Sequence, residues 1–204
     1  MRAPARKGFP IILTAPSGAG KTTLSCEIIK LHPEIHYSIS VTSRPPRSVE
    51  SDGQDYHFVS VAEFEKMLEN KEFAEWAMVH DNYYGTPKKQ IEERIDNGID
   101  VIMDIDTVGA RSIERLFPQA VTIFVLPPSL EVLGERLRSR ATDTEEIIKK
   151  RLNQAKLELL EIGDFEYFIV NDEFEDAVAQ VRAIIEAERC KLTRYEMKAV
   201  IDIR

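Results

Sequence analysis

The sequence predicts an α/β fold in which a parallel sheet is flanked by helices, with two smaller pieces inserted into it. Short apolar segments alternate along the chain with longer segments of helical periodicity, a pattern typical of a sheet covered on both faces. A glycine-rich loop joins the first apolar segment to the first helical one. The length of 204 residues, with 43% hydrophobic and 30% charged residues, suits one compact unit with a sizeable core.

The core of this fold is predicted from two sets of segments. Apolar runs indicate buried strands at residues 9–14, 99–104, 120–126 and 167–170. Helical patterns lie between and after them, at residues 21–31, 87–97, 108–117, 129–140, 144–162 and 174–192. We therefore assign residues 1–36, 87–128 and 163–204 to the core.

Residues 37–86 interrupt the alternation and predict a small, mostly β insert. This segment is rich in Ser, Thr, Tyr, Phe and Val, and it alternates with period two around residues 56–59. A helical pattern covers residues 61–70, and Trp76 is expected to pack in the core of the insert. Turn formers punctuate the segment at residues 45–46, 52–53 and 81–82.

Residues 129–162 form the second inserted piece, which we expect to be two helices meeting at residues 141–143. Thr142 and Glu145 match a capping box at the start of the second helix, and Gly163 fits the position after its end. Positive charge is concentrated here in an otherwise acidic chain. The arginines concerned are Arg136, Arg138, Arg140 and Arg151, of which Arg138 points off the shared helical face and is expected to be solvated.

The formal charge of −8, from 27 basic and 35 acidic residues, argues against a partner that is a nucleic acid polymer or an anionic membrane. An anionic ligand must then be held by a local basic cluster. The two cysteines are far apart, which suits reduced thiols. No apolar run has the length of a signal peptide core or of a spanning helix, so a cytoplasmic protein is expected.

The strongest local motif is the loop between the first predicted strand and the first predicted helix. Its backbone N–H groups and the helix N-terminus predict an anion site, with Lys21 reaching the β- and γ-phosphates and Thr22 offering a hydroxyl to Mg²⁺. The strict pattern has glycine where Ala15 stands. The expected phosphate-binding residues of this segment are Ala15, Pro16, Ser17, Gly18, Ala19, Gly20, Lys21, Thr22 and Thr23.

A carboxylate and a pair of arginines extend this interpretation. Asp104 ends an apolar run, as the acidic residue of a Walker-B strand does, and would hold Mg²⁺ directly or through water. Residues 106–109 also fit the D-x-x-G pattern of a GTPase switch, but the chain lacks the accompanying N-K-x-D motif in the required order. Arg44 and Arg47 flank two prolines that stiffen the backbone, and this pair suits a second phosphate.

Eight motifs in order make the chain resemble the guanylate kinases, nucleoside-monophosphate kinases of the P-loop superfamily, from about residue 9 to residue 186. The resemblance predicts a P-loop kinase core with a GMP-binding insert and a helical lid. The motifs are APSGAGK at 15–21, SVTSRPPR at 40–47, DYHFV at 55–59, FAEWA at 73–77, NYYGT at 82–86, DID at 104–106, RATDTEE at 140–146 and VND at 170–172.

The resemblance implies that ATP donates a phosphoryl group to GMP, and also to dGMP, with Mg²⁺ as cofactor. It implies catalytic roles for Lys21, Arg47, Arg140 and Arg151. Arg136, Asn171 and Asp172 would bind ATP together with the loop residues 15–23, and Thr22 and Asp104 would bind the metal. The implied GMP-binding residues are Ser40, Arg44, Arg47, Tyr56, Glu75, Tyr84, Thr86 and Asp106.

Two features depart from this pattern, and two other interpretations compete with it. Ala141 replaces a glycine common at the lid turn, and the segment from about residue 189 extends beyond the family's core. Scaffold modules of similar sequence bind phosphopeptides, but they typically lose the loop lysine and the lid arginines, which this chain has. A phosphosugar kinase would lack the guanine-reading residues. The sequence leaves the oligomeric state open.

Overall fold

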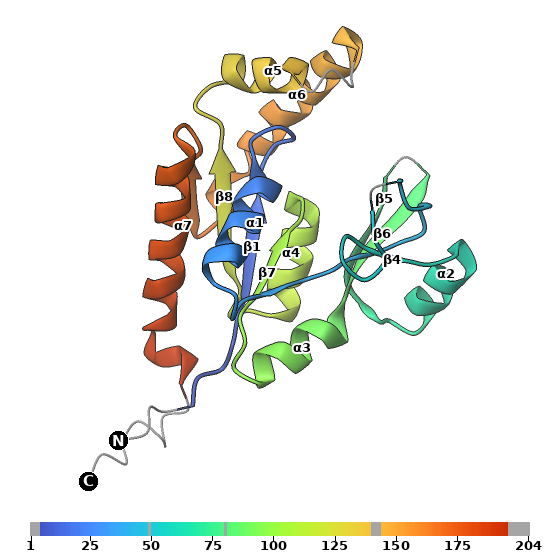
Figure 1. Ribbon diagram of the computed structural model, residues 1–204, viewed down its shortest axis with the longest axis vertical. Helices are drawn as coiled ribbons and strands as arrows, with labels where there is room; N and C mark the ends of the chain where they lie inside the picture. The colour runs from blue at the N-terminus through green and yellow to red at the C-terminus, as the bar shows by residue number, and fades with distance from the viewer. Residues whose placement is uncertain (1–4, 49, 80, 140–143, 196–204) are drawn as a thin grey trace.

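The computed structural model describes residues 5–48, 50–79, 81–139 and 144–195, and its core is a five-stranded parallel sheet (Figure 1). The strand order is β2-β7-β1-β8-β9, with neighbouring strands parallel throughout. Their bounds are β1 Pro10–Thr14, β2 His36–Tyr37, β7 Val101–Asp104, β8 Val121–Leu126 and β9 Tyr167–Val170. The four predicted strands are confirmed, and β2 was not predicted.

Helices cover both faces of this sheet because each presents an apolar side to it. On one face α1, Lys21–Leu31, and α7, Phe174–Arg189, bury Leu24, Ile28 and Val181 against the strands. On the other face α3, Lys88–Asp96, and α4, Thr107–Leu116, bury Ile91 and Ile113. The predicted α/β class with a parallel sheet is thus confirmed.

The insert forms a second sheet, beside the core in Figure 1, with the order β4-β3-β6-β5. Its strands are β3 Val41–Thr42, β4 His57–Phe58, β5 Phe73–Val79 and β6 Asn82–Pro87, and it carries α2, Val61–Glu69. Phe64 of α2 stacks between Phe73, at 4.4 Å, and Tyr83, at 5.0 Å between ring centroids. The expected burial of Trp76 is wrong: its side of β5 faces solvent, and 51% of the residue is exposed.

Two helices, α5 at Leu130–Ser139 and α6 at Glu145–Leu159, lie above the carboxyl end of the core sheet (Figure 1). Leu133 and Leu137 of α5 form a buried cluster with Ala19 of the glycine-rich loop. The N-cap of α6 is Thr144, whose side chain accepts a hydrogen bond from the Ile147 N–H, so the assignment of the cap to Thr142 is wrong. Thr142 and Arg140 lie outside the described residues.

The end of α6 also differs from the sequence prediction. The helix ends at Leu159, and Gly163 lies inside a 3-10 turn, Ile162–Asp164, so Gly163 is not the residue after the helix end. Farther along the chain, α7 ends at Arg189 and is followed by a 3-10 turn, Leu192–Arg194. Arg194 is buried there and pairs with the buried Glu188 at 2.6 Å. This part of the extension is therefore docked on the core.

Among the described residues, no helix is long and apolar enough to cross a membrane. Cys26 and Cys190 are free thiols, as expected from their separation in the sequence.

Candidate active site

The glycine-rich loop connects β1 to α1 and has the geometry of an anion site. Gly18 and Gly20 adopt φ angles of 98° and 96°, which other residues rarely tolerate, and the Ala19 N–H donates to the Pro16 carbonyl at 3.0 Å. The free N–H groups at the N-terminus of α1 attract negative charge. The first turn of this helix contains no acidic side chain that would repel an anion. The loop borders a cavity of about 330 Å³, which Thr23 of α1 also lines.

Lys21 lines this cavity, and its ammonium group donates to the Ile105 carbonyl at 2.9 Å. Burial lowers the pKa of Lys21, and surrounding carboxylates oppose that shift. These carboxylates come from separate parts of the fold: Asp104, Asp106, Glu158 and Glu75. The lysine is thus held extended toward the site, and its charge is compensated by acids in this structure.

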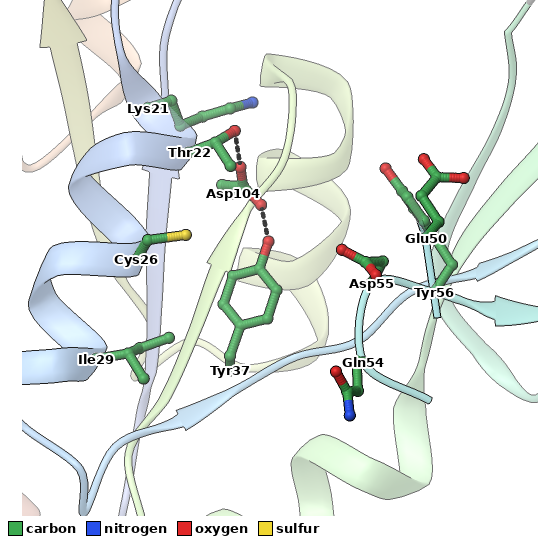
Figure 2. Close-up of a pocket in the computed structure, with 10 residues that line it drawn as sticks. All are labelled: Lys21, Thr22, Cys26, Ile29, Tyr37, Glu50, Gln54, Asp55, Tyr56 and Asp104. Atoms are coloured by element: carbon green, nitrogen blue, oxygen red, sulfur yellow. Dashed lines mark hydrogen bonds between the residues drawn. The ribbon is translucent and has the colours of Figure 1, made fainter. Parts of the chain in front are cut away.

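Asp104 ends β7 opposite the start of α1 and accepts two hydrogen bonds (Figure 2). The Thr22 hydroxyl donates to Oδ2 at 2.6 Å, and the Tyr37 hydroxyl donates to Oδ1 at 2.5 Å. Burial, followed by the charge of Asp104, raises the pKa of Tyr37, so this phenol stays a donor. Tyr37 belongs to β2, the strand that the sequence did not predict.

The oxygens of Thr22 and Asp104 fit a magnesium ion. Mg²⁺ prefers hard oxygen ligands and is usually bound through one or two carboxylates, water and substrate phosphates. In the described part of the chain, no group of three or more His, Cys, Asp or Glu residues could hold a metal alone. A single carboxylate and a hydroxyl beside the phosphate loop therefore suit Mg²⁺ that arrives with a nucleotide.

A larger cavity, of about 620 Å³, lies between α1 and the insert. Lys21, Thr22 and Asp104 line its core side, while Glu50, Asp55 and Tyr56 line it from the insert (Figure 2). The remaining lining residues shown in Figure 2 are Cys26, Ile29, Tyr37 and Gln54. The cavity has enough room for a ligand that contacts both the core and the insert.

The predicted phosphate-binding arginines both contact Glu50, an insert residue that lines this cavity. Glu50 binds the Arg44 guanidinium through two hydrogen bonds of 2.9 Å, and this bonding raises the pKa of Arg44. Arg44 Nε also donates to the Tyr84 hydroxyl at 3.1 Å, and the guanidinium lies over the Tyr56 ring at 5.6 Å. The Arg47 side chain is 74% exposed, with Nη1 3.9 Å from Glu50. The sequence analysis did not single out Glu50, the acid that holds the pair.

A carboxylate cluster lies where β5 and β6 of the insert face α4. The Thr86 hydroxyl donates to Glu75 Oε1 at 2.5 Å, and burial raises the pKa of Glu75. Asp106 is the N-cap of α4 and accepts from the Gly109 N–H at 2.8 Å, which accounts for the D-x-x-G pattern without a GTPase switch. A Cβ on Gly109 would lie 3.2 Å from Glu75 Oε2 and 3.3 Å from Asp106 Oδ1. Gly109 therefore leaves room for both acids.

The remaining predicted site residues that the structure describes are Arg136, Arg151, Asn171, Asp172 and Ser40. Arg138 is compared with them because it lies on the same helix as Arg136. Arg151 of α6 donates to the Ser17 hydroxyl at 3.2 Å, which brings it to the phosphate loop, whereas Arg138 pairs with Glu145 and is half exposed. Arg136 donates to the backbone carbonyl of Asn171 at 3.0 Å. Elsewhere, Asp172 is exposed and Ser40 is partly buried before β3.

Glu158 of α6 is a further residue that the sequence analysis missed. It lines the loop cavity together with Lys21 and Asp106, and burial raises its pKa. It was missed because it lies on a helix among other charged residues, where the sequence pattern indicates only an exposed face. Only the packing of α6 over the loop brings this acid to Lys21.

The fold and the site define a P-loop kinase in which a phosphate loop and an arginine-tyrosine cluster flank one cavity. A family model described as "Guanylate kinase" matches residues 7–188. The guanylate kinase of Carboxydothermus hydrogenoformans is 45% identical over 96% of both chains, and that of Geobacter sulfurreducens is 48% identical over 97% of both. A crystal structure of guanylate kinase from Anaplasma phagocytophilum, 30% identical, superposes with a TM-score of 0.79 over 98% of this chain and 97% of that chain. The chain belongs to the guanylate kinase family.

Proposed function

We propose that this chain catalyses the Mg²⁺-dependent transfer of the γ-phosphoryl group of ATP to GMP, giving ADP and GDP, and that it also accepts dGMP. Guanylate kinase activity follows from its family, while the metal, the second acceptor and the residue roles are our proposal. The observation that carries it is one cavity with Lys21, Thr22 and Asp104 on one side and Tyr56 on the other. A kinase needs this arrangement, because its two substrates must meet.

The GMP phosphate binds the insert through Arg44, Arg47, Tyr56 and Tyr84. Arg44 is already oriented by Glu50 and by the Tyr84 hydroxyl, so little side-chain freedom is lost when a phosphate binds. A guanidinium fork matches phosphate oxygens well, and the incoming phosphate takes over hydrogen bonds that Glu50 accepts in the free protein. Arg47, which is exposed, has room to turn toward the same phosphate.

The guanine base is read by Glu75 and Asp106, with Ser40 and Thr86 beside them. Guanine presents N1–H and N2–H₂ donors, which match carboxylate acceptors, whereas adenine would place its N1 acceptor against a carboxylate. A site built for these hydrogen bonds rejects the analogue that lacks them, by roughly 10⁴-fold in strong cases. The closeness of the two acids at Gly109 supports this assignment.

ATP binds with its phosphates on the loop at residues 15–23. Lys21 contacts the β- and γ-phosphates, and Arg136, Arg140 and Arg151 of the helical lid bring positive charge to the transferring group. The contact between Arg151 and Ser17 supports a lid that reaches the loop, and Asn171 and Asp172 complete the ATP site. The GMP phosphate is already a nucleophile at neutral pH, so positioning and charge stabilisation by Lys21 and the arginines account for catalysis.

Magnesium, held by Thr22 and by Asp104 directly or through water, would neutralise phosphate charge while ATP is bound. Tyr37 and Thr22 orient the Asp104 carboxylate through their two hydrogen bonds. The insert at 37–86 and the lid at 129–162 would each close toward the core formed by 1–36, 87–128 and 163–204. We place the activity in the cytoplasm, where ATP and GMP are available, with no nucleic acid or membrane partner.

A substrate panel tests the proposal. ADP release from the purified protein, measured in a coupled assay with ATP and GMP, dGMP, AMP or UMP, should show turnover with GMP and dGMP and little with AMP or UMP. Omitting Mg²⁺ or adding a chelator should abolish turnover. Absence of turnover with GMP, or preference for AMP, would contradict the proposed function.

A further inference from the structure

Asn171 lies beneath the phosphate loop. It directly follows β9, and its backbone N–H donates to the Leu126 carbonyl at 2.8 Å, which continues the pairing of β8 with β9. Only 5% of the residue is exposed. Its side-chain Nδ2 donates to the carbonyl of Ala19 at 2.7 Å. Ala19 itself is fully buried, so this hydrogen bond satisfies a carbonyl that water does not readily reach.

The adjacent Gly20 shows how closely Asn171 fits the loop. A Cβ built on Gly20 would lie 2.3 Å from Asn171 Nδ2, a distance at which one of the two groups must move. Gly20 is also the N-cap of α1, with φ at 96°. The absence of a side chain at Gly20 therefore serves two purposes: it permits the left-handed backbone and it leaves space for the Asn171 amide.

The helical lid contacts the same point from the other side. Arg136 of α5 donates to the backbone carbonyl of Asn171 at 3.0 Å, and Leu133 and Leu137 pack on Ala19. Asn171 is thus bonded to the sheet, to the loop and to the lid. Its side-chain NH₂ group and its backbone carbonyl are both hydrogen-bonded to protein groups.

We propose that Asn171 is a positioning residue that sets the conformation of the phosphate loop at Ala19 and Gly20. Its effect on ATP passes through the loop N–H groups that receive the phosphates, not through contact with the adenine base. This inference rests on the proposed function, since it concerns how the ATP site of that activity is shaped. It changes the role that the resemblance implies for Asn171, while Arg136 and Asp172 keep theirs.

The test separates phosphate binding from base binding by using a ligand with no base. Calorimetry would measure the affinities of tripolyphosphate, ATP and GMP for the wild type and for Asn171→Ala. Losing the hydrogen bond to a buried carbonyl should weaken tripolyphosphate and ATP by the same factor, about tenfold. GMP should bind both proteins equally, which also shows that the variant is folded.

Two further proteins make the result decisive. Asn171→Ser keeps a polar side chain that lets water bridge to Ala19, and it carries the test if the alanine variant does not fold; tripolyphosphate should again weaken with ATP. Glu173→Gln changes an exposed residue two positions along the chain as a matched control, and its affinity for tripolyphosphate should equal that of the wild type. Weaker ATP with unchanged tripolyphosphate in the Asn171 variants would overturn the inference. Failure of the wild type to phosphorylate GMP would instead overturn the proposed function.

Discussion

Replacing Glu75 by glutamine should weaken GMP much more than ATP. The substitution keeps the size of the side chain and leaves one oxygen to accept from Thr86. The second carboxylate oxygen becomes an NH₂ group, which faces a donor of the guanine base. One hydrogen bond to a charged acceptor, typically about 1.5–3 kcal/mol, is then lost. This loss corresponds to GMP binding about 10- to 150-fold more weakly.

The pKa of Glu75 adds a second, independent readout. Because burial raises the pKa of Glu75 above the ordinary value of 4.5, the folded protein holds this proton at a pH where the unfolded chain has released it. The free energy of unfolding therefore falls as pH rises from 4.5 through the folded pKa. Glutamine does not titrate, so the variant does not lose stability in this way as pH rises. Above that pH range the variant should therefore melt at a higher temperature than the wild type, and below pH 4.5 it should have no such advantage over the wild type.

Calorimetric titration of GMP and ATP, with thermal melts between about pH 4 and 8, measures both effects. Glu65→Gln provides a matched control, since it removes the same charge from an exposed position on α2 of the same insert. As pH falls through the raised pKa, Glu75 becomes neutral and loses its advantage over glutamine, so the ratio of wild-type to variant GMP affinity should decline. The titration of GMP itself affects both proteins equally and cancels in this ratio. A GMP affinity unchanged within twofold, or an equal loss for ATP, would refute the placement of guanine at Glu75.

Three further predictions concern neighbouring positions. Gly109→Ala should weaken GMP several-fold, because its Cβ crowds the Glu75 carboxylate; unchanged GMP titrations would place guanine elsewhere. Lys21→Ala should abolish turnover in the coupled assay while GMP still binds in calorimetry, and equal loss of both would make Lys21 structural. Tyr37→Phe removes the hydrogen bond to Asp104 Oδ1 and should raise the Mg²⁺ concentration needed for tight ATP binding about tenfold; an unchanged Mg²⁺ titration would separate Tyr37 from the metal site.

The sequence was informative where the chemistry is local. The phosphate loop needs consecutive residues between a strand and a helix, and Gly18 and Gly20 adopt the positive φ angles that such a loop requires. The four predicted strands are apolar runs because both faces of the sheet are covered. By contrast, β2 has only two residues, His36 and Tyr37, and its pairing with β7 leaves no pattern in the sequence. The fold class could therefore be predicted more fully than the strand list.

Partners that are distant in the chain could not be predicted. Tyr37 and Asp104 are 67 residues apart, and Asn171 and Ala19 are 152 residues apart, so neither hydrogen bond has a local signature. Glu50 is close to Arg44 in sequence, but the pairing depends on a turn that bends the segment back. The resemblance indicates which residues take part in a site. It does not indicate whether a residue contacts the ligand or holds another residue in place.

The distribution of charge explains how an acidic chain can bind two anionic nucleotides. Around the cavity, described cations face carboxylates: Arg44 is bonded to Glu50, and Lys21 lies in the field of acids that include Asp104 and Glu158. A phosphate that enters must take over these interactions, so binding exchanges one anion for another instead of neutralising a bare cation. The gain is then largest for a ligand whose phosphates reach both cations with correct geometry. A polyanion that cannot enter the cavity meets a surface of net negative charge, since the chain carries a formal charge of −8.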